Sequence, residues 1–298
     1  VLRRELAKKR VKVLCKTKVS NLLVKGQRVR GVELKDKTVL EASKVILATG
    51  GASYSFTGSD GKGVKIAERS GHLIVGFKPG LVPLVVKESY PLALEGLTLR
   101  NIRLQFSNGK NKIQSDTGEM VFTKKGISGP LVLSLSGRVA DWLHDERKAF
   151  VDIDLKPALS EEQLRARLLR EIEQSPRKGI KNLLKEMLPL RLIPIFLSSA
   201  GVLPEKRVNQ LTRSERKAIL SLLKAFRLNI CATAGIENAM VSRGGVSLKE
   251  IDPRTMVSRI VEGLYFCGEM IDIDADTGGF NLQAAFSTGY LAGTSCRP

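Results

Sequence analysis

The sequence has few of the residues that catalyse hydrolysis or bind transition metals. Its 298 residues include only two histidines and four cysteines, and no two cysteines have the spacing of a zinc or dithiol motif. A Ser-His-Asp or Cys-His mechanism would have to use His72 or His144. The local pattern places these at a helix-to-strand junction and on a helix surface. The isolated cysteines favour a reducing cytoplasm, and we expect no metal site.

Long apolar runs and a dinucleotide-binding loop are also missing. The longest uncharged stretch, 277–296, is rich in glycine and polar side chains, so we expect no membrane association. The glycine-rich segment Gly58–Gly63 has the wrong spacing for a GxGxxG loop and follows no predicted strand.

Charge is abundant and unevenly distributed. The net charge is +19, and residues 161–231 contribute 15 basic and seven acidic side chains, whereas residues 232–298 have five basic and eight acidic. Such an excess attracts polyanions, with a generally lysine-rich composition as the alternative explanation. Aromatic residues make up only 5% of the chain, which favours contacts with RNA shape and phosphate over base stacking.

The pattern of apolar residues changes twice along the chain. Residues 1–78 and 236–298 combine short strands and helices, including an apolar run, Val45–Ala48, that indicates a buried parallel strand. Residues 79–158 have nearly alternating apolar positions, typical of strands. Residues 159–235 have helical periodicity and two capping boxes, which begin at Ser160 and Thr212.

Two glycine-rich segments stand where predicted strands end. The first is VILATGG, Val45–Gly51, and the second extends from Gly263 to Gly293 and contains Glu269. Glycines at the carboxyl end of a parallel strand let backbone approach a cofactor. Glu269 is suited to hydrogen-bond sugar or ribityl hydroxyls. Gly278 and Gly279 open a helix whose free N–H groups suit a pyrophosphate or an electron-rich ring edge.

Two other patterns have alternative interpretations. Asp272, Asp274 and Asp276 alternate like calcium ligands, but the EF-hand glycine and glutamate are absent at the required positions. The segment VFTKKGISGP, Val121–Pro130, forms either a substrate-facing loop or a structural turn between a barrel strand and a helix.

Taken together, these segments resemble the HI0933-like flavoproteins, also described as BaiN/RdsA-type NAD(P)/FAD-dependent oxidoreductases. The resemblance covers essentially the whole chain. It is carried by ATGG, SGH, LVPL, FTKKGISGP, RGGV with the following EI and TM pairs, GLYFCGE and DTGGFNLQ. It implies an α/β fold, in which a split, Rossmann-like FAD-binding domain of the two-dinucleotide type contains inserted β-barrel-like and helical domains. The corresponding ranges are 1–78 with 236–298, 79–158 and 159–235.

The resemblance also implies cofactor-binding positions. Val19 would offer its backbone to the adenine, and Ala48, Thr49 and Gly50 would pass near the adenosine and pyrophosphate. Gly268 precedes Glu269, which would approach the ribityl chain. The residues expected at the pyrophosphate or flavin edge are Gly278, Gly279, Asn281, Leu282 and Gln283. The sequence does not identify a general acid or base, and NAD(P)H is the candidate electron donor.

One departure from the family is the absence of the N-terminal GxGxxG strand and loop. We therefore expect that a dinucleotide-binding half is missing and that the chain alone holds FAD poorly. Three functions remain open: a flavoenzyme acting on a small molecule, a flavoenzyme reducing a base in RNA, and an inactive fragment. If RNA is the substrate, basic side chains of 160–227 should form a surface continuous with the mouth of the flavin site. The oligomeric state is left undetermined.

Overall fold

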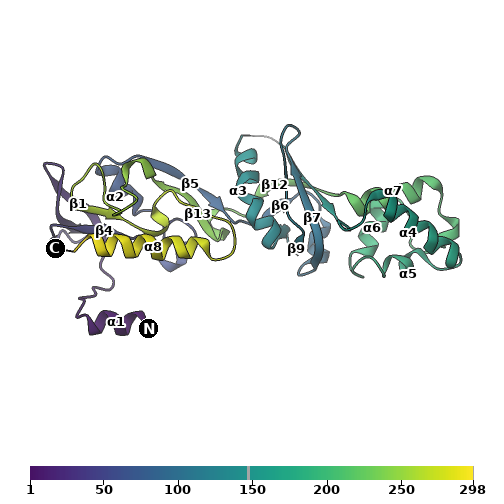
Figure 1. Ribbon diagram of the computed structural model, residues 1–298, viewed down its shortest axis with the longest axis horizontal. Coiled ribbons are helices and arrows are strands. Elements are labelled where there is room, and N and C mark those ends of the chain that lie inside the picture. The colour runs from purple at the N-terminus through teal and green to yellow at the C-terminus, as the bar shows by residue number, and fades with distance from the viewer. Residues whose placement is uncertain (146–147, 298) are drawn as a thin grey trace.

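The molecule is elongated and consists of three units in a row (Figure 1). The computed structural model describes residues 1–145 and 148–297. An α/β unit contains the C-terminus, and α1 with the N-terminus projects away from it; a barrel unit lies in the middle, and a helical unit lies at the opposite end. The chain thus leaves the α/β unit once, builds the other two units, and returns.

The α/β unit combines segments that are far apart in the sequence. β1–β2–β3 form a three-stranded antiparallel sheet, β5 pairs antiparallel with β13, and β4 pairs parallel with β14. The elements are α1 (Leu2–Lys8), β1 (Val19–Lys25), β2 (Arg28–Leu34), β3 (Val39–Glu41), β4 (Val45–Leu47), α2 (Val64–Arg69), β5 (Ile74–Gly80), β13 (Val241–Val246), β14 (Leu264–Phe266) and α8 (Phe280–Ser295).

The parallel pair β4–β14 positions the site, because both strands end at the same edge. Leu47 is opposite Phe266, and the Cys267 N–H donates to the Leu47 carbonyl at 3.1 Å. The two apolar runs recognised in the sequence therefore lie side by side, and the loops that follow them face one another. α8 packs against β14 and against the turn that follows it.

The barrel unit is a sheet that closes on itself. Its order is β11-β12-β6-β10-β9-β7-β8, and β11 also pairs with β7, which completes the ring. α3 packs against several of its strands. The elements are β6 (Leu84–Val86), β7 (Thr98–Ser107), β8 (Lys112–Gln114), β9 (Gly118–Thr123), β10 (Gly126–Ser128), α3 (Pro130–His144), β11 (Ala149–Asp154) and β12 (Phe226–Thr233).

The two longest helices of the helical unit begin where the capping boxes in the sequence predict. The side chains of Ser160 and Thr212 each accept a hydrogen bond from the backbone N–H of the residue three positions later, Gln163 and Glu215 respectively. The side chain of that later residue in turn accepts from the backbone N–H of the capping residue. These bonds satisfy donors that a helix start leaves free. The helices are α4 (Glu161–Gln174), α5 (Ile180–Leu184), α6 (Ile193–Ala200) and α7 (Arg213–Lys224).

Two expected boundaries differ from the structure. β12 was expected in the helical segment, but it pairs with β11 and β6 and so belongs to the barrel. Its alternate residues Phe226, Leu228 and Ile230 are buried, a pattern that a neighbouring amphipathic helix obscures in the sequence. β5 continues to Gly80, two residues past the expected end of the first segment, because its pairing with β13 continues to Val241.

The described residues form two hydrophobic cores. One joins the barrel and helical units, and the other lies inside the α/β unit around Phe266 and Val246. Among the described residues, no helix is both long enough and apolar enough to cross a membrane.

Candidate functional site

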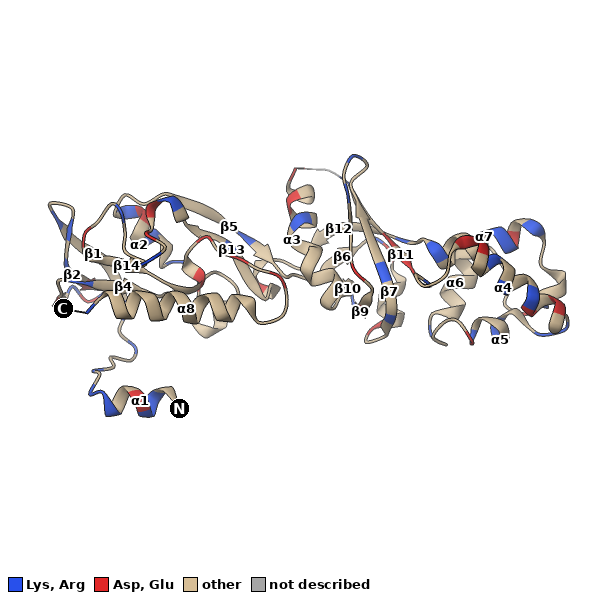
Figure 2. Cartoon of the chain, in the orientation of Figure 1, with Lys and Arg blue, Asp and Glu red and all other residues tan. Residues whose placement is uncertain are grey.

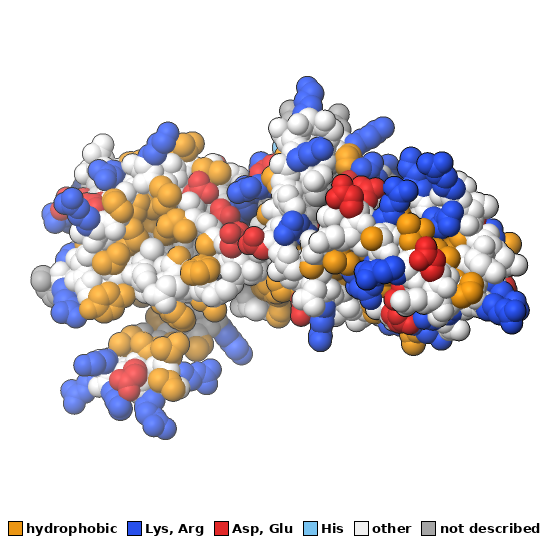
Figure 3. Space-filling view, turned by 45° about the vertical axis from the view of Figure 1, so that its right-hand side comes forward, with side chains coloured by type: hydrophobic (Ala, Val, Ile, Leu, Met, Phe, Trp, Pro, Cys, Tyr) orange, Lys and Arg blue, Asp and Glu red, His pale blue; other side chains and the backbone are white. Residues whose placement is uncertain are grey.

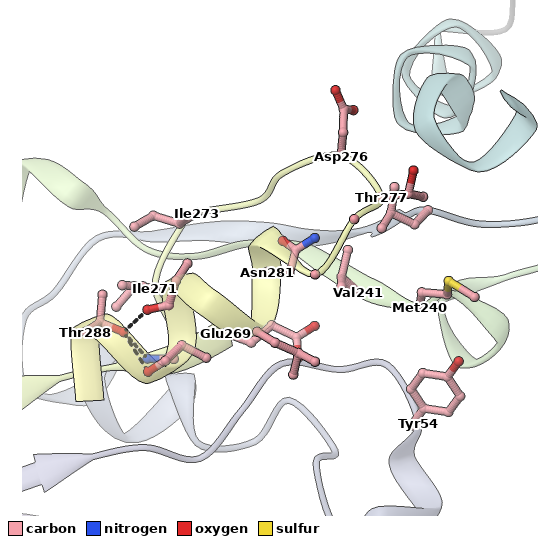
Figure 4. Close-up of a pocket in the computed structure, with 17 residues that line it drawn as sticks. Tyr54, Met240, Val241, Glu269, Ile271, Ile273, Asp276, Thr277, Asn281 and Thr288 are labelled. Atoms are coloured by element: carbon pink, nitrogen blue, oxygen red, sulfur yellow. Dashed lines mark hydrogen bonds between the residues drawn. The ribbon is translucent and has the colours of Figure 1, made fainter. Parts of the chain in front are cut away.

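A pocket of about 400 Å³ lies beside the N-terminus of α8 (Figure 4). Its volume is in the range of small-molecule and cofactor sites. The lining is mostly apolar and comes from four separate stretches of chain. These residues are Tyr54, Leu81, Met240, Val241, Gly268, Glu269, Ile271, Ile273, Asp276, Thr277, Gly278, Gly279, Asn281, Leu282, Ala284, Ala285 and Thr288.

Glu269 is the acidic side chain at the centre of the wall. Its Oε1 accepts from the Ser242 N–H at 2.5 Å and from the Ser53 hydroxyl at 3.2 Å. The Ser242 hydroxyl oxygen in turn accepts from the N–H groups of Ala52 and Ser53. A Cβ at Gly51 would lie 2.9 Å from Glu269 Oε1, so a larger residue there would displace the Ser242 and Glu269 side chains. The loops after β4 and β14 and the start of β13 are thereby locked around one carboxylate.

The N-terminus of α8 presents unused backbone donors to the pocket. Gly279 caps the helix at φ 87°, a conformation that favours glycine, and no side chain caps the helix. The N–H groups of Phe280, Asn281 and Leu282 have no acceptor among the described residues. Such donors, together with the positive end of the helix dipole, suit an anion or an electron-rich ring edge.

Asn281 fixes the loop that forms the rim of the pocket. Its Oδ1 accepts from the Ala275 N–H at 2.9 Å, and its Nδ2 donates to the Ala275 carbonyl at 2.7 Å. The amide side chain is thus occupied by the protein itself. We infer that Asn281 positions the loop 273–279 and leaves ligand binding to backbone groups.

A charged cluster ties this loop to the barrel unit. Arg243 on β13 donates to the Gly137 carbonyl at 2.9 Å and to Asp141 at 3.1 Å, and it lies 3.6 Å from Asp274. Lys78 donates to the other oxygen of Asp141 at 3.1 Å. Burial raises the pKa of Asp141, but the hydrogen bonds from Arg243 and Lys78 outweigh it and hold that pKa below its ordinary 3.8.

We expect Asp141→Asn to destabilise the protein at neutral pH, by up to about 1 kcal/mol, since both ion pairs are partly exposed. A carboxylate with a lowered folded-state pKa stabilises above its unfolded pKa and loses that contribution as pH falls through the folded value. The difference between the two proteins should therefore shrink below pH 3.8. Urea unfolding at pH 7 and at stepwise lower pH measures this. A difference that does not change with pH would contradict the electrostatic explanation.

The structure brings together six of the eleven positions expected to bind cofactor. Gly268, Glu269, Gly278, Gly279, Asn281 and Leu282 all line the pocket. Gln283 is exposed on α8, where its amide donates to Ser287 at 3.0 Å.

The other four expected positions lie outside the pocket lining. Thr49 lies against Gly63 and its hydroxyl is 3.7 Å from the Met270 sulfur, while Gly50 faces Ser59. Ala48 is exposed after β4, and Val19 packs on the core of the α/β unit. Their roles toward a cofactor remain predictions.

Several lining residues were not found from the sequence. Tyr54, Met240 and Val241 come from a loop and a strand end with no sequence motif that would mark them, and Leu81 begins the LVPL motif but was not expected to line a site. The two histidines do not line the pocket. His72 is buried between the Ala67 carbonyl and the Ser258 hydroxyl, and burial lowers its pKa, so it acts as a neutral structural group. The segment Val121–Pro130 forms the β9–β10 hairpin and the start of α3, as in the structural-turn interpretation.

The pocket suits part of a flavin better than a metal ion. The apolar slot, the free N–H groups and the Glu269 carboxylate match a flat ring with a polar edge and a hydroxylated chain, and Asp276 is a second acidic residue of the lining. A Cβ at Gly268 or Gly279 would meet nothing within 4 Å, so open space lies in front of both backbones. The described residues contain no group of three or more metal-binding side chains.

Comparison with known proteins gives consistent matches over most of the chain. The family described as the HI0933-like protein Rossmann domain matches residues 1–295. A 3-dehydro-bile acid delta(4,6)-reductase of Clostridium scindens is 32% identical over 295 residues, which cover 98% of this chain and 71% of that protein.

Two ribosomal RNA dihydrouridine synthases are similar to a comparable degree. The Haemophilus influenzae protein is 30% identical over 299 residues, covering 99% of this chain and 71% of that protein. The Escherichia coli protein is 33% identical over 252 residues, which cover 83% of this chain and 59% of that protein. A solved E. coli quinol fumarate reductase FrdA chain has a TM-score of 0.37 and 16% identity, with 94% of this chain and 44% of that chain covered.

Proposed function

Because the chain belongs to the HI0933-like family of Rossmann-domain proteins, we propose that it is an FAD-dependent oxidoreductase whose substrate binds beside the N-terminus of α8. The observation that carries the proposal is the pocket itself. It combines an apolar lining with the free N–H groups of α8 and with Glu269. When bound, the flavin supplies the hydride chemistry, and the protein supplies binding and orientation.

The chain's own residues have separate tasks in this proposal. The N–H groups of Asn281 and Leu282, which line the pocket, would donate to the electron-rich edge of the ring. Glu269, held by Ser242 and Ser53, accepts from hydroxyls of the ribityl chain. Leu81, Met240 and Ile273 exclude water from the remaining space, which favours a small apolar substrate such as the unsaturated steroid acid in the name of the first relative.

A second candidate substrate is a base in RNA. Two relatives are named ribosomal RNA dihydrouridine synthases, and the net charge of +19 favours a polyanionic partner. The expected basic surface is not continuous with the pocket. The helices that carry it lie at the opposite end of the molecule, with the barrel unit between (Figure 1). RNA therefore requires a docking surface remote from the pocket.

An anaerobic reduction experiment tests the proposal and separates the substrates. The protein is mixed with FAD and NADPH or NADH, and bleaching of the flavin absorption band reports acceptance of the donor. An unsaturated steroid acid or a uridine-containing RNA is then added, and return of the band identifies the oxidising substrate. We expect protein-dependent bleaching followed by reoxidation by one of the two. Bleaching at the same rate without protein, or with the pocket blocked, would overturn the proposal.

A further inference from the structure

A second groove lies in the helical unit, between α4 and α7. Its volume is about 360 Å³, close to that of the pocket beside α8. The groove is basic, whereas the pocket beside α8 is mostly apolar: four basic side chains and one acidic side chain surround the leucines at the bottom of the groove. The lining residues are Glu161, Arg165, Leu168, Leu169, Arg213, Arg216, Lys217 and Leu220. Figure 2 marks Lys and Arg positions in blue on the helices at this end of the molecule.

Helical spacing explains how the cations gather there. Arg213, Arg216, Lys217 and Leu220 stand at positions i, i+3, i+4 and i+7 of α7, which is one face of a helix. Arg165 stands one turn before Leu168 and Leu169 on α4. Leu168 and Leu220 pack into the core between the helices, so the basic side chains border the groove on both sides.

The four groove cations lack carboxylate partners, whereas several lysines elsewhere in this unit have them. Elsewhere in this unit Lys206 lies 2.7 Å from Glu215, and Lys178 lies 2.5 Å from Glu186. In contrast, Arg165, Arg213, Arg216 and Lys217 form no ion pair with any described acidic residue. Like charges held on one face repel each other, and an anionic ligand would relieve that repulsion.

We propose that the α4–α7 groove is a docking site for the phosphodiester backbone of RNA. Three of its four cations are arginines, whose planar guanidinium groups bind phosphate through two parallel hydrogen bonds. The leucine floor fits the less polar ribose between successive phosphates. Figure 3, which brings this end of the molecule forward, shows basic side chains spread over its surface, so a long polyanion meets further positive charge beyond the groove.

The position of the groove also favours a macromolecule. The barrel unit lies between the groove and the pocket, so one small metabolite cannot occupy both (Figure 1). A folded RNA can be held by its backbone at the groove while another part of it reaches the pocket. The choice of RNA as the polyanion rests on the RNA candidate of the proposed function, whereas the groove as an anion site rests on its own residues.

A pair of matched variants tests the docking site. In the groove variant, Arg165→Gln, Arg213→Gln and Lys217→Gln remove three exposed positive charges. In the control, Arg170→Gln, Arg177→Gln and Lys185→Gln remove three exposed positive charges of the same unit that lie outside the groove. Fluorescence anisotropy with a labelled single-stranded RNA is measured from low to moderate salt. Thermal unfolding confirms that all proteins are folded.

We expect the groove variant to bind RNA roughly tenfold or more weakly at low salt, and its salt slope to fall by roughly 2 if three phosphate contacts are lost. The control should stay near the original affinity. Equal weakening of both variants would overturn the proposal, because it would indicate a diffuse charge effect. So would equally strong binding of polyglutamate or of anionic lipid vesicles, or no RNA binding at low salt. Flavin binding should be unchanged in both variants, so the experiment can reject the docking site without rejecting the proposed flavin site.

Discussion

Replacing Ala285 by tryptophan is expected to abolish most flavin binding while the protein stays folded. Ala285 is half-buried on α8 and lines the pocket, so a large indole there fills the space proposed for the flavin ring. Forcing a ligand against an overfilled site costs about 1–3 kcal/mol, which corresponds to roughly a ten- to hundredfold loss of affinity. Titration of FAD into the protein, followed by quenching of flavin fluorescence, measures the dissociation constant.

The matched control is Ser287→Trp on the same helix. Ser287 is exposed and does not line the pocket, so the same indole there should leave the affinity within about twofold, the range of a neutral surface change. Equal affinity of Ala285→Trp and the original protein would place the flavin elsewhere.

Gly245→Ala is expected to cause the largest loss of stability. Gly245 is buried in β13 at φ 128°, where side chains are strained, and a Cβ would collide with the backbone carbonyl of Met270. Backbone strain alone costs about 1–3 kcal/mol, and the collision adds to it because β13 cannot move away from the turn without disturbing its pairing with β5. β13 lies against the turn containing Glu269, so the same change should weaken flavin binding. Urea unfolding gives the stability loss.

Gly76→Ala provides the control for that prediction. Gly76 lies on β5, the partner strand of β13, but it is exposed, has an ordinary φ, and a Cβ there meets nothing within 4 Å. We expect an unchanged or slightly higher stability, by at most about 1 kcal/mol. A Gly245→Ala protein as stable as Gly76→Ala would show that the turn adapts easily, contrary to the rigid site described above.

Local patterns predicted much of this architecture. The apolar run Val45–Ala48 indicated a buried parallel strand and the run Gly263–Cys267 a strand before the second glycine-rich segment, and β4 and β14 pair in parallel. The capping boxes at Ser160 and Thr212 marked helix starts to the residue. Each of these signals is carried by a few adjacent residues, which is why the sequence alone reveals them.

Features that depend on distant partners were missed. Tyr54, Leu81 and Met240 line the pocket only because the chain returns to the α/β unit after two other units. The partners of Arg243, Asp141 and Asp274, come from α3 and from the loop before α8. Asn281 lines the pocket as expected, but its side-chain amide holds Ala275, and the sequence does not reveal that contact. Spacing alone cannot tell whether a polar side chain is used by the protein or by a ligand.

The most direct test of the flavin site is a crystal structure of the protein with FAD. The account predicts electron density for the flavin ring in the pocket, against Ala285 and with its polar edge within hydrogen-bond distance of the first N–H groups of α8. The ribityl chain should extend toward Glu269. Flavin bound elsewhere on the protein would contradict the assignment.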